Sequence, residues 1–126
     1  MAKRKAKPAR KRAARRKSKK IDLWSAGKLP KEALSLVVSL RARTGQQLLL
    51  EAELKALAGP TRKEVGCITY DLHRSLDSAE GFLLHEIWAT RDAHTAHTKT
   101  PHFLRWEARK DSLLASRDLS FWKFIY

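Results

Sequence analysis

From Ala33 onward, apolar and polar residues follow the two periods that distinguish strands from helices. Residues 34–40 form a short run rich in Leu and Val, which favours a strand. Leu50, Leu54 and Leu57 lie four and three positions apart, which favours an amphipathic helix. The strands predicted in this way span residues 34–43, 67–74, 82–89 and 119–126, and the helices span residues 46–58 (with a short continuation to 63), 90–99 and 100–113.

The second and third of these strands are separated only by the turn-forming sequence LDSAEG, so we expect them to pair as an antiparallel hairpin. The resulting order predicts an α+β fold of the ferredoxin-like type, β-α-β-β-α-β. The helices then cover one face of the sheet. The other face carries Leu83, His85 and Ile87 together with apolar residues of the last strand. Because such a face is too apolar for solvent alone, we expect two copies to pack sheet against sheet as a homodimer.

Charge divides the chain into two parts. Residues 1–20 hold twelve of the 27 Lys and Arg residues and none of the 13 Asp and Glu residues, so the remainder is close to neutral. We expect a disordered basic arm over residues 1–30 and a folded domain over residues 31–126. We expect such an arm to contact polyanions such as nucleic acid non-specifically or to act in targeting, and the alternative is a solubilising tail with no selected role. The predicted polyanion-binding residues are Lys3, Arg4, Lys5, Arg10, Lys11, Arg12, Arg15, Arg16 and Lys17.

The remaining composition narrows the class of protein. A single cysteine, Cys67, excludes an internal disulfide framework and fits a reducing compartment. No apolar run approaches the roughly 18–20 residues that cross a bilayer, and the N-terminal charge is not followed by the apolar core of a secretory signal. We therefore expect a cytoplasmic protein with no membrane partner. The sequence contains neither a Gly-rich phosphate loop nor a nucleophile elbow.

Several short motifs lie between residues 58 and 103. They are AGPTR at 58–62, GC at 66–67 before Tyr70, LHR at 72–74, FLLHE at 82–86 before Trp88, AH at 96–97 and TPHF at 100–103. With this spacing, the chain resembles the antibiotic biosynthesis monooxygenase family over about residues 33–126. The resemblance implies a dimeric α+β barrel with one pocket per protomer between sheet and helices. It also implies oxidation of a small quinol-like or phenolic aromatic by dioxygen, without a cofactor.

Three residues are candidate catalytic groups that move the substrate's proton. His97 and His102 belong to the AH and TPHF motifs, and imidazole titrates near neutrality; packing and helix capping are the alternative roles. Glu86 is predicted to face the helices, and a carboxylate directed inward must be paired or protonated. We favour a structural ion pair with Arg41 or Arg43, and a raised-pKa acid or base is the alternative.

The predicted substrate-binding residues are aromatic or apolar: Trp88, Tyr70, Leu84, Phe103 and Trp106. Trp88 matches the Trp that lines the pocket in relatives, although a core role fits it equally. Leu84 stands where anthrone-oxidising relatives carry an amide, and the first strand lacks the Asn of haem-degrading relatives. A metal site on His94 and His97 with His85 has no cysteine and no defined third ligand, so we predict no metal. The alternative function is a non-catalytic dimeric barrel that binds a small aromatic ligand, with the basic arm contacting polyanions.

Overall fold

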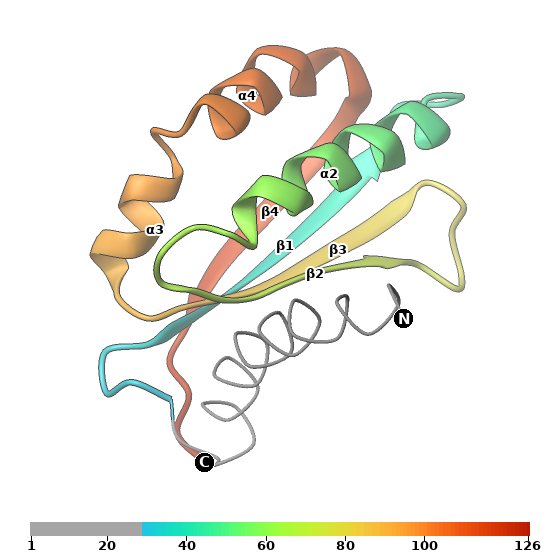
Figure 1. Cartoon of the computed structure of the whole chain (residues 1–126). Coiled ribbons are helices and arrows are strands. Elements are labelled where there is room, and N and C mark those ends of the chain that lie inside the picture. Colours follow the sequence, from blue (N-terminus) through green and yellow to red (C-terminus); the bar gives the residue numbers. More distant parts are fainter. Residues whose placement is uncertain (1–28) are drawn as a thin grey trace, which may run out of the picture. The chain divides into compact units, whose positions relative to one another are not determined.

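The structure is a computed structural model that describes residues 29–126 (Figure 1). Its elements are β1 (Leu34–Ala42), α2 (Gln47–Thr61), β2 (Cys67–Arg74), β3 (Gly81–Trp88), α3 (Arg91–His97), α4 (Pro101–Leu113) and β4 (Leu114–Trp122). The arm predicted for residues 1–30, with its polyanion contacts, lies outside the described residues except for the last two positions. Within residues 29–126, no helix has the length and apolar character needed to span a membrane.

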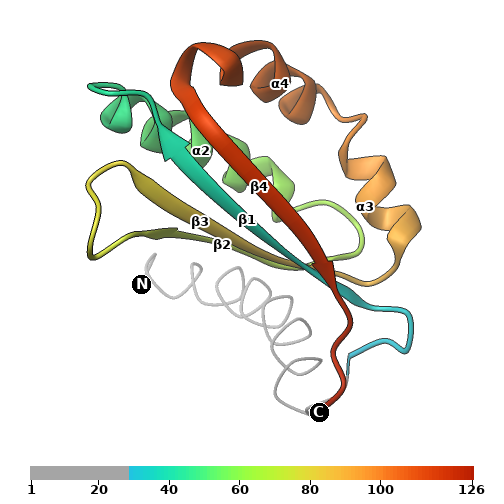
Figure 2. The same cartoon turned by 180° about the vertical axis from the view of Figure 1, so that it is seen from behind.

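The four strands form one sheet in the order β2-β3-β1-β4, and every neighbouring pair is antiparallel. The helices α2, α3 and α4 lie on one face of this sheet, and the view from behind shows the strands in front of them (Figures 1 and 2). This arrangement confirms the predicted ferredoxin-like fold. The second helical region is divided into α3 and α4, as the Thr100–Pro101 sequence predicted.

Alternate side chains of the sheet point towards the helices. The register places Tyr70 of β2, Glu86 of β3 and Leu36 of β1 opposite one another, so these three share the inner face. The burial of β3 follows the predicted alternation from Phe82 to Glu86, with the even-numbered residues inward, whereas Ile87 on the outer face is also buried. The core packed against this face includes buried residues of the two longest helices: Leu50, Leu54, Leu57, Trp106 and Leu113.

The boundaries predicted for the last strand, 119–126, are wrong. β4 begins at Leu114, immediately after α4, and ends at Trp122. The prediction relied on apolar residues, whereas residues 115–118 read Ala-Ser-Arg-Asp and are exposed. Their strand conformation comes from backbone pairing with β1, which runs from Ala42 opposite Leu114 to Ser35 opposite Trp122. A backbone ladder of this kind leaves no hydrophobic pattern in the sequence.

Local signals fix the break between α3 and α4. Thr90 caps the start of α3. The Thr100 hydroxyl accepts the N–H of Phe103 at 3.2 Å and donates to the carbonyl oxygen of His97 at 2.8 Å. Pro101 occupies the first turn of α4, where its missing N–H has no cost. The break therefore places His97 at the end of one helix and His102 at the start of the next.

Gly66 permits the close approach of the α2–β2 loop to α3. Its φ is +89°, which favours glycine, and a Cβ at this position would lie 2.6 Å from the Cβ of Ala93. Its carbonyl oxygen also accepts the N–H of Ala89 at 2.8 Å. The chain segment before β2 is therefore fixed against the start of α3.

Candidate active site

A cavity of about 240 Å³ lies between the inner face of the sheet and the helices. Its wall combines apolar and aromatic side chains with a few titratable ones, as small-molecule sites do. The lining residues are Val38, Leu40, Leu57, Tyr70, Leu84, Glu86, His94, His97, Thr98, Phe103, Trp106, Glu107, Arg117 and Leu119. The site is therefore built mainly from β1, β3, α4 and the end of α3.

His97 is the most enclosed titratable residue of this wall. Its side chain is 2% exposed, and aromatic rings surround it. The ring centroid of Trp88 lies 4.8 Å away, that of Phe103 lies 4.9 Å away in an edge-on arrangement, and that of Tyr70 lies 5.8 Å away. The imidazole therefore occupies an aromatic environment that excludes water.

Glu64 brings both predicted histidines to one carboxylate oxygen. Its Oε2 lies 2.7 Å from Nδ1 of His97 and 2.6 Å from Nε2 of His102. An ionised carboxylate only accepts hydrogen bonds, so we assign a donating N–H to each of these nitrogens. This assignment leaves Nε2 of a neutral His97 as a proton acceptor.

The loop between α2 and β2 holds Glu64 in place. Its backbone N–H donates to the carbonyl oxygen of Thr61 at 3.0 Å, and its own carbonyl accepts the N–H of Cys67 at 3.1 Å. The side chain of Glu64 is only 13% exposed. The carboxylate is therefore positioned by the backbone at both ends of a short loop.

Burial determines the charge of the imidazoles next to the cavity. Burial lowers the pKa of His97, and the nearby His102 lowers it further, while the hydrogen bond to Glu64 acts in the opposite direction. The pKa of His94 is lowered by burial and then by the neighbouring His97 and Arg91. Both histidines are therefore neutral at pH 7, which is the form that accepts a proton.

Glu86 is a buried acid next to the same cavity. Its Oε1 accepts a hydrogen bond from Nε1 of Trp88 at 2.8 Å. Burial raises the pKa of Glu86 to about 7, with a smaller contribution from the charge of Glu64; the Trp88 hydrogen bond counteracts this rise. The favoured ion pair is wrong, because Arg41 contacts Glu80 and the Arg43 side chain donates to a backbone carbonyl.

The cavity wall contains most of the predicted site residues: Tyr70, Leu84, Glu86, His97, Phe103 and Trp106. Trp88 and His102 are placed differently. Trp88 is fully buried behind the wall, where its ring is tilted by 36° against that of His97 and its Nε1 donates to Glu86. His102 lines a separate cavity of about 310 Å³ between α2 and α4. Glu64 therefore lies between two histidines that face different cavities.

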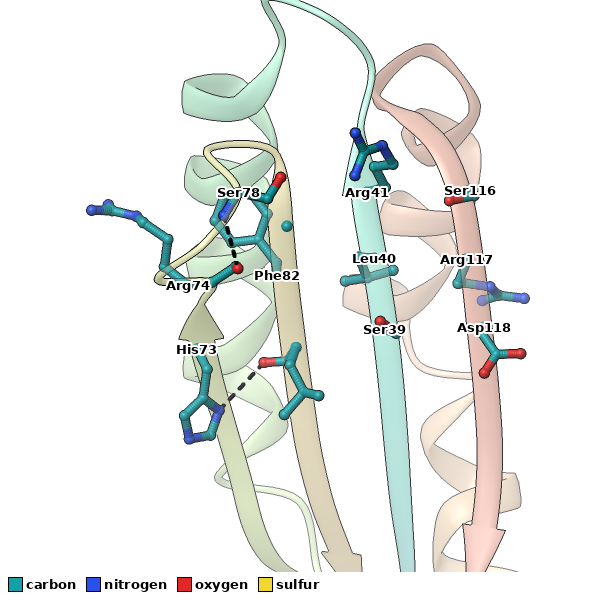
Figure 3. Close-up of a pocket in the computed structure, with 13 residues that line it drawn as sticks. Ser39, Leu40, Arg41, His73, Arg74, Ser78, Phe82, Ser116, Arg117 and Asp118 are labelled. Carbon is teal, nitrogen blue, oxygen red and sulfur yellow. Dashed lines mark hydrogen bonds between the residues drawn. The ribbon is translucent and has the colours of Figure 1, made fainter.

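A larger hollow of about 570 Å³ lies near the β2–β3 turn. Figure 3 shows His73 and Arg74 on β2 at one border and Arg117 and Asp118 on β4 at the other. Each of its three arginines pairs with a carboxylate: Arg41 with Glu80, Arg74 with Glu51 and Arg117 with Glu107. Each arginine of the hollow therefore has a carboxylate partner. We assign the candidate active site to the smaller cavity, because the buried titratable residues Glu86 and His97 line it.

Of the three histidines considered for a metal site, only His97 belongs to a group whose side chains converge. His85 points to the outer face, because it lies opposite Asp71 and Val37 rather than on the rung of Glu86. Among the described residues, a group with metal-ligand chemistry is formed instead by Glu64, His97 and His102. Their donor atoms lie within 4.8 Å of one another.

The model of the antibiotic biosynthesis monooxygenase family matches residues 33–109. The chain belongs to this family. The matched region runs from the residue before β1 into α4, so it includes Glu64, Glu86, His97 and His102. Only the β4 part of the cavity wall lies beyond it.

Individual proteins resemble this chain in both sequence and fold. The chain is 35% identical over 81 residues to Rv0793 of Mycobacterium tuberculosis, a protein named provisionally as a monooxygenase; the match covers 64% of this chain and 79% of that protein. The solved structure of Rv0793 superposes with a TM-score of 0.72 at 28% identity, covering 75% of this chain and 97% of that one. PA3566 of Pseudomonas aeruginosa gives 0.71 at 33% identity, covering 75% and 96%.

A more distant neighbour shares the fold alone. SnoaB of Streptomyces nogalater, described as a cofactor-independent oxygenase, superposes with a TM-score of 0.68 at 16% identity, covering 75% of this chain and 95% of that one. The fold of the family is therefore kept over a wide range of sequences.

Sequence reasoning missed Glu64. It follows Arg62 and Lys63 in a polar loop, which is typical of a solvated charge. The available signal was its place between the AGPTR and GC motifs, within a segment whose spacing already matched the family. Its partners, His97 and His102, are 33 and 38 residues away in sequence. Only the packed fold brings these residues together.

Proposed function

We propose that this chain is a cofactor-independent monooxygenase that oxidises a small quinol-like or phenolic aromatic with dioxygen. The observation that carries the proposal is His97, a buried neutral imidazole at an aromatic cavity, held through Nδ1 by Glu64. Such a group provides a proton acceptor in a dry site, and a phenol must lose its proton before it transfers electrons readily. Membership of the monooxygenase family supports the reaction class.

The reaction starts with transfer of the phenolic proton to Nε2 of His97. Glu64 stabilises the resulting imidazolium, as the acid of a hydrolase triad does for its histidine. The substrate anion then reduces dioxygen: one oxygen atom enters the ring and the other leaves as water. A quinol that becomes a hydroxyquinone supplies every electron and proton that this reduction needs, so no external reductant takes part.

Two further groups complete the proton transfers. Glu86 lines the cavity, and with a pKa of about 7 it exchanges a proton readily at neutral pH. His102 lies on the far side of Glu64, and its side chain is 21% exposed. The Glu64–His102 pair therefore connects buried His97 to the cavity between α2 and α4.

The dimensions of the cavity favour a small substrate. Its volume of about 240 Å³ lies below the roughly 300–1,000 Å³ of sites for drug-sized ligands. We therefore expect a substrate of one or two rings, seated against Leu84, Phe103 and Trp106. Tyr70 offers a phenolic donor, because burial and the nearby Glu86 raise the pKa of Tyr70 and keep it protonated.

We further propose a cytoplasmic homodimer in which two sheets pack face to face. Large apolar residues at the end of β4 and in the segment after it are exposed: Trp122, Phe124, Ile125 and Tyr126. Trp122 lies opposite Ser35, which lies opposite Ile87, so it belongs to the outer face of the sheet. Sedimentation of residues 31–126 tests the dimer, and a stable monomer at micromolar concentration contradicts it.

Oxygen uptake by metal-stripped protein tests the reaction. We expect saturable uptake with a panel of quinols and hydroxylated aromatics, without added flavin or metal. His97→Gln should lower kcat by about 10²–10⁴-fold, the usual contribution of a general base. Glu64→Gln should lower kcat with little change in KM, because it no longer stabilises the imidazolium.

The matched control is Glu32→Gln, which removes an exposed carboxylate that does not line the cavity and should leave uptake unchanged. Oxygen uptake by His97→Gln with an unchanged kcat contradicts the assignment of His97 as the general base. Saturable binding of the same aromatics without any uptake supports the non-catalytic alternative instead.

A further inference from the structure

Glu64, His97 and His102 present one oxygen and two nitrogen donors to a common point. The carboxylate Oε2 lies within 2.7 Å of both imidazole nitrogens, and the three donor atoms lie within 4.8 Å of one another. The three side chains come from the α2–β2 loop, the end of α3 and the first turn of α4. Each of these segments is fixed by backbone or capping hydrogen bonds, so the backbone positions that carry the three donors are preorganised.

Two imidazoles and a carboxylate are the ligands of many divalent transition-metal sites. Ligands about 2.0–2.2 Å from one ion lie roughly 3.0–3.5 Å apart in adjacent positions. The two O···N distances therefore need to open by less than about 1 Å for an ion to replace the hydrogen atoms between these atoms. The two imidazole nitrogens, which lie within 4.8 Å of each other, need to come to the same spacing. Side-chain rotation of Glu64 and of partly exposed His102 provides a change of this size.

We propose that Glu64, His97 and His102 bind a single divalent transition-metal ion of the Zn²⁺ type. The ion enters from the cavity between α2 and α4, because His102 lines that cavity while His97 is buried. Three protein ligands leave at least one coordination position, which water fills. The chain therefore carries a metal site within residues whose role in the proposed reaction is to move protons.

Metal binding reverses the tautomer of His97, and this consequence rests on the proposed function. The ion takes the Nδ1 lone pair, so the ring proton of neutral His97 moves to Nε2. With Nε2 protonated, His97 no longer accepts the phenolic proton of the substrate. The metal-bound form is therefore inactive, and the site acts as a metal-dependent switch.

Calorimetric titration of metal-stripped full-length protein with Zn²⁺ tests the site without any substrate. We expect one ion per chain. Glu64→Gln and His102→Gln should each weaken affinity by at least the 10–100-fold that even outer-sphere substitutions cost. His94→Gln is the matched control: it removes an imidazole whose centroid lies 6.0 Å from that of His97, and it should bind as the wild type does.

Two results overturn the site: no saturable binding at one ion per chain, or binding that persists in both Glu64→Gln and His102→Gln. Loss of binding in His94→Gln with retention in His102→Gln also overturns it, because the ion then sits on the His94–His97 pair. Thermal melting of each variant without metal shows whether a loss of Zn²⁺ binding results from a failure to fold. Glu64→Gln keeps an acceptor oxygen for the imidazoles, so it remains informative if His102→Gln fails to fold.

Oxygen uptake separates the switch from the site. Zn²⁺ should abolish uptake at concentrations that fill the calorimetric site, and a chelator should restore it. Uptake that continues at full occupancy overturns the tautomer argument and leaves the metal site standing. Absence of uptake in metal-free protein contradicts the proposed function alone, because the binding isotherm does not depend on turnover.

Discussion

Replacing Glu86 with Gln should stabilise the fold at alkaline pH and leave it unchanged in acid. The carboxyl has an ordinary pKa of 4.5, and burial raises this pKa to about 7 in the folded chain. Folding therefore takes up a proton at any pH between these two values, and ionising Glu86 inside the fold costs free energy. At about 1.4 kcal/mol per pH unit, the full cost above pH 7 is about 3 kcal/mol.

The sign follows from which state binds more protons. Below pH 4.5 the group is protonated in both states and the wild type is not penalised. As pH rises from 4.5 to 7, the unfolded chain releases its proton first, so the free energy of unfolding falls. Glutamine keeps the oxygen that accepts from Nε1 of Trp88 and never ionises. The variant therefore loses this pH dependence.

Urea denaturation at pH 4.5 and pH 8.5 measures the effect. We expect unfolding free energies of wild type and Glu86→Gln to agree at pH 4.5 and to differ by about 3 kcal/mol at pH 8.5, with the variant more stable. Protein concentration is held constant, because the stability of the proposed dimer would depend on it. Glu32→Gln, at an exposed carboxylate, should show no such difference. An equal difference at both pH values would show that Glu86 does not titrate as the structure implies.

Two other predictions concern the backbone and the arm. Gly66→Ala should destabilise the domain by about 2 kcal/mol or more, because this position combines a positive φ with a Cβ that would lie 2.6 Å from the Cβ of Ala93. Gly45 has a φ of +81° but open space around it, so Gly45→Ala should cost only about 1 kcal/mol. Equal losses of unfolding free energy in chemical denaturation of the two variants contradict the packing argument. Deleting residues 1–20, which carry twelve basic residues and no acidic ones, should abolish salt-sensitive retention on nucleic acid without changing oxygen uptake; equal retention at low salt places the binding elsewhere.

Those parts of the fold with a periodic or capping signal were predictable from the sequence. The Thr100–Pro101 pair marked the α3–α4 break, and the alternation in β3 placed Glu86 on the inner face. The start of β4 was not predictable, because residues 115–118 pair through backbone atoms while their side chains are exposed. Element prediction from hydrophobic pattern fails wherever pairing alone holds a strand.

In the candidate site, too, the residues with a local sequence signal were predictable and those brought together by tertiary packing were not. Tyr70, Leu84 and Phe103, which were predicted to bind substrate, line the cavity, because apolar and aromatic side chains that face the interior of the domain pack between the sheet and the helices. The environment of Glu86 was mistaken, because its stabilising partner is an indole two residues away rather than a distant arginine. The partnership of Glu64 with two histidines depends on tertiary packing across more than thirty residues, which no local pattern encodes.

The break between α3 and α4 also determines which residues can act together. In an unbroken helix, residues five positions apart point about 140° away from each other. His97 and His102 nevertheless meet at one carboxylate, because the chain changes direction between them. Evolution can therefore alter this chemistry without touching a reactive side chain. A substitution at Thr100 that lets the two helices merge would separate the histidines, whereas insertions in loops other than the α2–β2 loop, which carries Glu64, would leave both histidines on that carboxylate.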